Sequence, residues 1–329
     1  MPKKMSKTRE LLVQEFINSL KEDTINWNKP WRVLEQVNAV SNYRYRGINQ
    51  FWLNIIATQR GYKDPRWVTF NQVKNNNWEL VDAKGQGVPV EFWSPYDTKE
   101  KKVITQEEVK ELLEKEPENK DRISFVCKCY YVFNASLVKG IPEFKYEEKT
   151  IEEENILNFF KEYLESQEIG LIYGGNSACF IPSLDEIHLP EFSRFEDEAS
   201  FYATLSHEIA HSTGMPSRLD RDLSGVFGSV SYAKEELRAE ISSSFLCGEL
   251  GLLNGERLNN NKAYVQNWID ILEKNPEELF KAITDAEKIT EFVLEKGDYQ
   301  FHIESQQEIK DLEKNPEFKQ DIEMGGLSV

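Results

Sequence analysis

Histidine and cysteine are both scarce in this sequence, with four of each among 329 residues. The cysteines contain no Cys-x-x-Cys pair and follow no regular spacing, which argues against a disulfide framework. Cys127 and Cys129 stand one residue apart in an alternating segment, so their side chains are expected on one face of a strand. We therefore expect reduced, buried or half-buried thiols, as in a cytosolic protein.

Long apolar runs are missing as well. No stretch approaches the roughly 18 apolar residues that a membrane-spanning helix requires. Residues 1–9 are basic, but the apolar segment of a signal peptide does not follow them. The sequence thus predicts a soluble, cytoplasmic protein with no membrane partner.

Basic residues are outnumbered. The chain holds 40 Lys+Arg against 57 Asp+Glu, a net charge of −17, which taken whole argues against a dedicated nucleic-acid binder. The deficit is uneven, because Met1–Trp93 holds 14 Lys+Arg against 9 Asp+Glu and the remainder holds 26 against 48. Six of the seven tryptophans also lie in Met1–Trp93. This asymmetry indicates that the first part of the chain faces nucleic acid.

The length allows two domains. Residues 1–148 combine a helical pattern near the start with expected strands at 87–95 and 123–134. The charged segment 97–122 is interpreted as a solvated, partly helical insert between those strands, which we expect to pair directly.

The second part, residues 149–298, is expected to be mainly helical, and 299–329 form an acidic tail. Short strands are expected around Gly174–Gly175 and Pro182–Ser183. The predicted fold class is α+β. It consists of an α+β module followed by a mainly helical domain.

Half of the histidines fall in one motif, "SHEIAH", on an expected helix that begins with a Ser193–Glu196 capping box. His207 and His211 are one turn apart, so both imidazoles can bind one Zn²⁺ and leave open positions for water. Glu208 lies beside them as a candidate general base. The alternative is a charged helix that carries the motif by chance.

A zinc site needs a third protein ligand, and the next helix offers three glutamates. At about 100° per residue, Glu235 lies about 200° from the apolar ridge of that helix and is expected to face solvent. Glu236 and Glu240 flank the ridge, so we predict Glu236 as the ligand and Glu240 as the carboxylate that orients a histidine. Weaker candidates for the third ligand are Asp220 and Asp222.

The segment "YATLSHEIAHSTGMPSRLDRDLSGVFGS" followed by "VSYAKEELRAEISSSFLC" resembles the metallopeptidase-like domain of the ArdC antirestriction family. Earlier in the chain, "WNKPW", "YRGIN", "RWVTFNQV", "KGQGVPVEFW" and "YYVFNASLVKGIP" resemble the family's single-stranded-DNA-binding domain. The match runs in the family's order over residues 6–295. The insert 97–122 and the acidic tail depart from it.

The resemblance implies an N-terminal module that binds single-stranded DNA and a zincin-like C-terminal domain. It also implies a role in protecting incoming plasmid or phage DNA from restriction. The family's metal ligands correspond to His207, His211 and Glu236, with one zinc ion per chain.

Single strands bind to basic grooves with aromatic platforms on which bases stack. In the basic stretch, aromatic and arginine residues alternate, and two neighbouring arginines would be difficult to bury without partners. The tryptophans at 52, 78 and 93 are assigned to the core. The predicted DNA-binding residues are Trp31, Arg32, Tyr43, Arg44, Tyr45, Arg46, Asn49, Arg66 and Trp67.

The sequence therefore predicts a single-stranded-DNA-binding antirestriction-type protein of mobile elements with a zinc metallopeptidase-like domain. Two alternatives stay open. One is a regulatory metallopeptidase that cleaves a protein partner such as a repressor. The other is a DNA-binding protein whose metal domain is catalytically inert.

Overall fold

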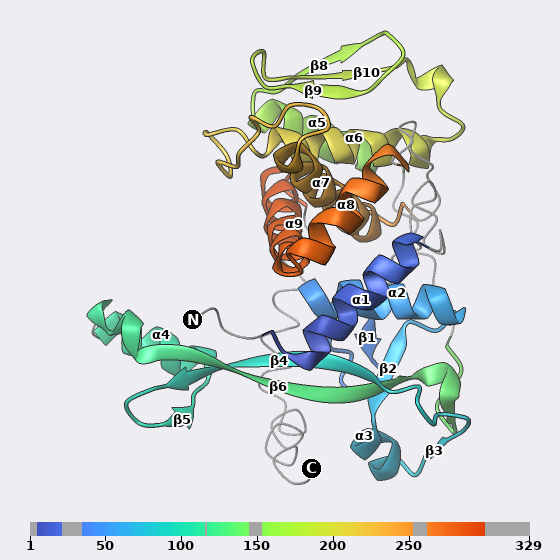
Figure 1. The fold of residues 1–329 in the computed structure, drawn as a ribbon, viewed down its shortest axis with the longest axis vertical. Helices are drawn as coiled ribbons and strands as arrows, with labels where there is room; N and C mark the ends of the chain where they lie inside the picture. Colours follow the sequence, from blue (N-terminus) through green and yellow to red (C-terminus); the bar gives the residue numbers. More distant parts are fainter. Residues whose placement is uncertain (1–4, 22–34, 116, 145–152, 253–261, 300–329) are drawn as a thin grey trace.

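The computed structural model describes residues 5–21, 35–115, 117–144, 153–252 and 262–299 (Figure 1). Its helices are α1 (Lys7–Lys21), α2 (Gly47–Arg60), α3 (Phe70–Asn75), α4 (Gln106–Lys115), α5 (Glu153–Ser166), α6 (Glu198–Ser212), α7 (Val230–Glu249), α8 (Lys262–Lys274) and α9 (Glu277–Lys296). Its strands are β1 (Val37–Asn38), β2 (Arg66–Thr69), β3 (Glu79–Leu80), β4 (Val88–Asp97), β5 (Lys102–Val103), β6 (Ile123–Asn134), β7 (Val138–Lys139), β8 (Gly170–Tyr173), β9 (Cys179–Ile181) and β10 (Glu186–Leu189). Short 3₁₀ helices lie at Pro117–Arg122, Ala135–Leu137 and Phe192–Arg194.

A five-stranded sheet organises the N-terminal part, in the order β1-β2-β6-β4-β5. The long strands β4 and β6 pair antiparallel from Val88↔Val132 to Asp97↔Ile123, which confirms that the strands flanking the insert pair directly. Their β-branched and aromatic residues suit a pleated surface. Helices α1 and α2 lie between this sheet and the C-terminal helices, whereas α3 lies on the other side of the sheet (Figure 1).

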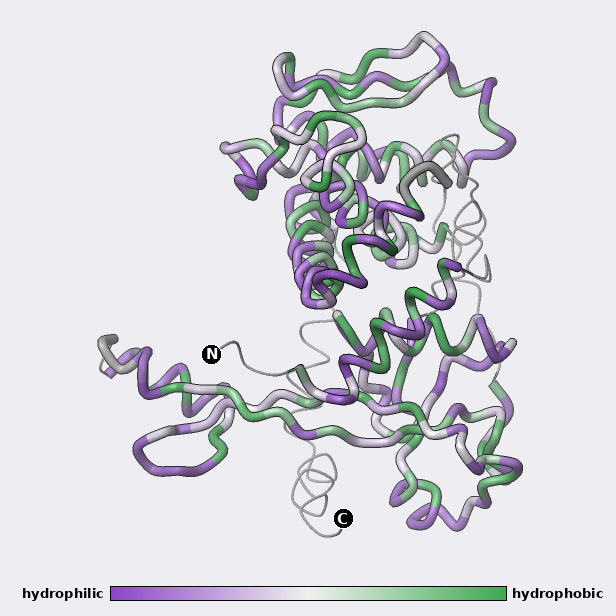
Figure 2. The backbone as a smooth tube through the Cα atoms, viewed as in Figure 1, coloured by the Kyte–Doolittle hydropathy of each residue, from purple (hydrophilic) through white to green (hydrophobic). Residues whose placement is uncertain are grey.

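The insert extends the β4–β6 ribbon away from the rest of the molecule and carries β5 and α4 (Figure 1). No residue of α4 is buried, and hydrophilic residues dominate the loop around β5 (Figure 2). Arg122 closes the base of the insert by donating to Asp97 over 2.5 and 2.8 Å. The expectation of a solvated, partly helical insert is thus confirmed.

In the C-terminal part, a small sheet in the order β8-β10-β9 lies over α5 and α6 (Figure 1). Short strands do lie around the predicted positions, because β8 ends at Tyr173 and β9 ends at Ile181, but the residues named in the prediction are not in the strands. Gly174–Gly175 and Pro182–Ser183 occupy the turns that connect the three strands. Both glycines have positive φ, 144° and 73°, a conformation in which a strand cannot continue.

The predicted start of the metal helix is also wrong. Helix α6 begins at Glu198, and its N-cap is Asp197, whose carboxylate accepts a hydrogen bond from the Ser200 amide at 2.7 Å. Ser193 lies instead in the short 3₁₀ helix Phe192–Arg194. The Asp197 carboxylate satisfies a backbone amide in the first turn of α6 that would otherwise lack a hydrogen bond. This stabilises a helix that begins at Glu198, later than predicted.

The main hydrophobic core crosses residue 148. It joins α1, α2 and the main sheet to one face of α7 and to α8 and α9, with Phe16, Trp52, Leu237, Trp268 and Ile283 all 3% exposed or less. A second core lies between α5, α6, the small sheet and the other face of α7. Helices α7 and α9 therefore contribute to both cores. Within the described part of the chain, no helix has the length and apolar content needed to cross a bilayer.

Candidate functional site

Helix α6 is buried on nearly all sides between the small sheet and α7, so its side chains are held in fixed positions. His207 and His211 project from successive turns, and their Nε2 atoms lie 3.2 Å apart. Two nitrogens that bind one tetrahedral ion at about 2.0–2.1 Å lie roughly 3.3 Å apart. The histidine pair is therefore spaced for a single ion.

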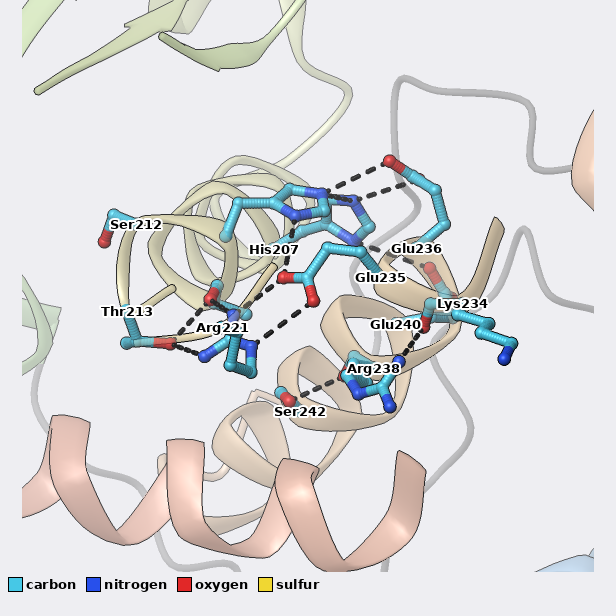
Figure 3. A network of polar contacts seen from close by, with 12 residues as sticks. His207, Ser212, Thr213, Arg221, Lys234, Glu235, Glu236, Arg238, Glu240 and Ser242 are labelled. Carbon is cyan, nitrogen blue, oxygen red and sulfur yellow. Dashed lines mark hydrogen bonds and ion pairs between the residues drawn. The ribbon is translucent and has the colours of Figure 1, made fainter. Parts of the chain in front are cut away.

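Helix α7 brings Glu236 to this pair (Figure 3). Its two carboxylate oxygens lie 3.6 Å from His207 Nε2 and 3.3 Å from His211 Nε2. One ligand atom from each of the three residues lies within 4.8 Å of the others, a group that could hold a metal ion. Two imidazoles and one carboxylate are a donor set typical of catalytic zinc sites, so the residues fit the predicted ion.

The second nitrogen of each histidine also faces a carboxylate. Glu240 lies 3.6 Å from Nδ1 of His207, where a carboxylate can orient the ring. Glu235 lies 3.5 Å from Nδ1 of His211 and is 7% exposed, so the expectation that Glu235 faces solvent is wrong. The weaker candidates Asp220 and Asp222 are both exposed.

Arg221 explains why Glu235 is buried. The loop after α6 folds back, and the guanidinium of Arg221 donates to Glu235 at 2.7 Å, to the Ala210 carbonyl at 2.7 Å and to the Thr213 hydroxyl at 2.7 Å (Figure 3). It thus joins the end of α6 to the first turns of α7. The position of Glu235 around its helix cannot reveal this partner, because the residue that covers Glu235 comes from a loop outside the helix.

The charges of the cluster compensate one another. Burial opposes the charge of Glu236, but hydrogen bonds from His207 and His211 lower its pKa below the ordinary value. Burial likewise opposes the charge of His211, whereas hydrogen bonds with Glu235 and Glu236 raise its pKa to about 10. An ionised carboxylate is the form that binds cations, so Glu236 is prepared to act as a ligand.

Glu208 follows His207 on α6 and is 3% exposed. Burial, and then the charge of Glu208, raise the pKa of the Cys179 thiol on β9. Strand β9 is an edge of the small sheet and contacts α6. Among the described residues, β9 pairs only on the side of β10, so an edge strand lies beside the helix that carries the two histidines.

Two of the predicted DNA-stacking residues are largely buried. Trp67 is fully buried, and its indole Nε1 donates to Gln36 at 2.6 Å. Tyr45 is 8% exposed and belongs to the main core. Trp67 lies beneath the helices that cover the sheet, so a base cannot stack on its ring, whereas Tyr45 is only slightly exposed. The prediction of Trp67 as a platform is wrong.

Two of the predicted arginines are engaged by carboxylates. Arg44 pairs with Glu249 of α7 at 2.9 Å and with Glu35. Arg66 pairs with Asp64 at 2.7 Å and also donates to the Pro142 carbonyl at 2.8 Å. These contacts supply the partners that the arginines need, and a phosphate would have to compete with them.

Tyr43, Arg46 and Asn49 from the predicted DNA-binding set line a cavity of about 800 Å³, together with Tyr45. Trp31 and Arg32 lie outside the described residues.

Sequence reasoning missed Trp93, which it assigned to the core. This side chain is 47% exposed and lines the same cavity. The assignment of Trp52 to the core is confirmed at 3% exposure. Three of the four cysteines, all except Cys247, are exposed rather than buried, and all four are free thiols.

Comparison with protein families adds two matches. The N-terminal domain of the anti-restriction factor ArdC matches residues 6–133, and the zincin-like metallopeptidase family matches residues 159–285. The first covers the main sheet with α1–α4, and the second covers the small sheet with α6 and α7. Each match lies on one side of residue 148, and the division of the chain at that residue stays a prediction.

Relatives of known sequence extend over most of this chain. Two Escherichia coli proteins named DNA primase TraC are 35% and 34% identical to 87% of the chain. The chain spans only 27% and 20% of their lengths. An uncharacterised protein of Sinorhizobium fredii, y4eC, is 30% identical over 86% of this chain and 90% of its own length.

Two solved structures of the antirestriction protein ArdC from plasmid R388 share the fold. The metal-free form superimposes with a TM-score of 0.66 at 28% identity, covering 89% of this chain and 98% of that protein. The Mn(II)-bound form superimposes with a TM-score of 0.66 at 28% identity, covering 88% of this chain and 98% of that protein. Because both halves match in order and the solved relative is covered almost throughout, this chain belongs to the ArdC antirestriction family.

Proposed function

We propose that this protein is a single-stranded-DNA-binding antirestriction protein of mobile elements whose C-terminal half carries a zinc-dependent metallopeptidase centre. The observation that carries the proposal is the convergence of His207, His211 and Glu236 within 4.8 Å on two buried helices. A solved relative is Mn(II)-bound, which supports a divalent metal in this protein. We expect zinc because of the donor set.

In this proposal each side chain has a distinct role. His207, His211 and Glu236 hold the ion, which when bound supplies a Lewis acid that polarises a carbonyl group. Glu240 and Glu235 orient the two histidine rings. Glu208 accepts a proton from the attacking water and passes it to the leaving amine.

The surroundings of the centre favour a peptide substrate. The free edge of β9 beside α6 can pair with an extended peptide through main-chain hydrogen bonds. The loop that precedes α7 exposes Val226 and Phe227 to 77% and 75%, an apolar surface that a protein substrate can cover. These features keep a regulatory peptidase acting on a protein such as a repressor as the second candidate function.

The DNA-binding role is supported by the ArdC N-terminal match and by the positive balance of Met1–Trp93. A single strand presents base faces that a duplex hides, so we expect the protein to prefer single strands. Binding should weaken as salt rises, because phosphate contacts release counterions.

Metal analysis of purified variants tests the centre. Wild-type protein should carry about one zinc-class ion per chain, His207→Ala should lose it and Glu208→Gln should keep it. His188→Ala is the control, because His188 lies on β10 and bonds Glu186 at 3.0 Å. Full metal content in His207→Ala would contradict the site.

Peptidase activity is tested on an unfolded protein substrate such as casein. Cleavage by the wild type and not by the metal-loaded Glu208→Gln variant supports the peptidase. Absence of cleavage, with metal bound and single-strand binding intact, favours the inert-domain alternative.

A further inference from the structure

The cavity of about 800 Å³ lies on the main sheet, far from the metal ligands in sequence. Its floor is one face of four adjacent strands, because the strand pairings place the floor residues on the same side. The floor residues are Asn38, Thr69, Val90, Phe92, Tyr130 and Val132. The volume lies in the range of roughly 300–1,000 Å³ typical of ligand sites.

The walls of the cavity come from both halves of the chain. The segment from Ser41 to Asn49 lines the cavity from the N-terminal half, and Phe280 and Thr284 of α9 line it from the C-terminal half. Arg9 stands at the rim, 5.5 Å from the ring centre of Trp93 and 4.6 Å from that of Phe280. The cavity therefore exists only when α9 is packed against the N-terminal part.

Flat, uncharged groups dominate the lining. Its aromatic members are Tyr43, Tyr45, Phe92, Trp93, Tyr130 and Phe280. Its amides are fixed in position: Asn38 and Gln72 donate to each other, both at 3.0 Å, and Asn49 donates to the Glu91 carbonyl at 2.7 Å. Aromatic faces stack on planar rings, and the fixed amides hold the walls of the cavity in place.

Several charged groups of the lining are paired with other protein groups. Arg9 donates from Nε and Nη2 to the Glu91 carboxylate at 2.9–3.2 Å, and Asp285 accepts from Arg238 at 2.7 Å. Overall the lining holds more carboxylates than basic groups. A phosphate would meet repulsion here, whereas a neutral planar ring would not.

We propose that this cavity receives unstacked bases of single-stranded DNA, while the phosphates stay outside it. The inference rests on the proposed DNA-binding function and identifies where the bases bind. It also makes α9, a helix of the C-terminal half, a part of the DNA site.

The test compares two probes on the full-length protein, an oligothymidylate and an abasic oligomer of equal length, by fluorescence anisotropy. The wild type should bind the thymidylate more tightly. Phe92→Ala should weaken thymidylate binding by about 5- to 150-fold, the loss of one stacked base, with little effect on the abasic oligomer. Thr284→Trp, at an exposed position of α9, should fill the opening and have the same effect, whereas Thr284→Ser should not.

Tyr131→Ala is the matched control, because Tyr131 is an aromatic residue of β6 that is 62% exposed and follows Tyr130 on the opposite face. Equal binding of both probes by the wild type would overturn the base site and leave phosphate-driven DNA binding standing. The base site would also be overturned if folded Phe92→Ala and Thr284→Trp bound the thymidylate as tightly as the wild type. A loss of thymidylate affinity in Tyr131→Ala as large as in Phe92→Ala would overturn it too. If the wild type binds neither probe, the proposed DNA-binding function fails together with the base site.

Discussion

Glu235 and Glu236 are adjacent in sequence, yet they face different nitrogens of His211. Glu236 lies 3.3 Å from Nε2, on the side shared with His207, and Glu235 lies 3.5 Å from Nδ1, on the side of Arg221. Because adjacent residues of a helix point in different directions, one glutamate is placed to bind the metal ion and the other to orient the His211 ring. Substitution of each glutamate separates these roles.

We expect Glu236→Ala to abolish tight metal binding, because it removes a ligand. Glu235→Ala and Glu240→Ala should each weaken metal affinity by about 10–100-fold, since they remove the partner that orients a histidine ring. Zinc titration against a competing chelator measures all three. Glu249→Ala is the control, because Glu249 belongs to α7 but pairs with Arg44. Unchanged affinity in Glu235→Ala would show that its contact with His211 does not position the ring.

At the scale of elements, Arg122 and Asp97 form an ion pair at the base of the insert. The hydrogen bond from Arg122, with further donation from the amides of Glu100 and Lys99, lowers the pKa of Asp97 below its ordinary value. A lowered folded-state pKa means that the contact stabilises the protein above the unfolded value of about 3.9. This contribution is lost as pH falls through the folded-state pKa.

Asp97→Asn should therefore increase hydrogen exchange at the base of the insert, where the Thr98 amide donates to the Arg122 carbonyl at 2.9 Å. The ratio of variant to wild-type exchange should be constant from neutral pH to about pH 5 and approach one only in stronger acid. Glu100→Gln serves as control, because Glu100 lies 3.7 Å from Arg122 and its side chain is 56% exposed. A ratio near one at neutral pH would rule out the stabilising role.

At the scale of the whole molecule, the two halves are joined by more than a linker. The main core contains side chains from α1, α2 and the sheet together with α7, α8 and α9. Arg44 adds a charged contact by pairing with Glu249 at the end of α7. Separation of the halves would expose Phe16, Trp52 and their neighbours to water.

A fragment of residues 1–148 should consequently unfold at lower temperature than the full chain, or without a cooperative transition. It should also lose the preference for base-containing single strands, because α9 is missing from the cavity. Thermal unfolding by circular dichroism and the two-probe binding assay measure these effects. Mixing with the complementary fragment 149–329 should restore both properties if the shared core is the cause. A fragment as stable as the whole chain would show that the N-terminal part folds on its own.

Local patterns in the amino-acid sequence determine much of this protein. The histidine spacing places His207 and His211 on one side of a helix, and alternation identifies the strands β4 and β6. Both features depend on interactions within one element or between neighbouring strands. The helix period of 3.6 residues and the strand period of 2 residues are enough to predict them. The phase of α7 likewise indicates Glu236.

Only the tertiary structure decided which of the remaining side chains are available. Trp67 is buried because two helices cover the sheet, and Glu235 is buried because Arg221 folds back from a loop. Arg44 is paired because α7 ends beside it, and the cavity is lined by α9, a helix more than 140 residues away in sequence from every strand of its floor. Each of these outcomes depends on contacts between distant segments, and no periodicity in the sequence encodes such contacts.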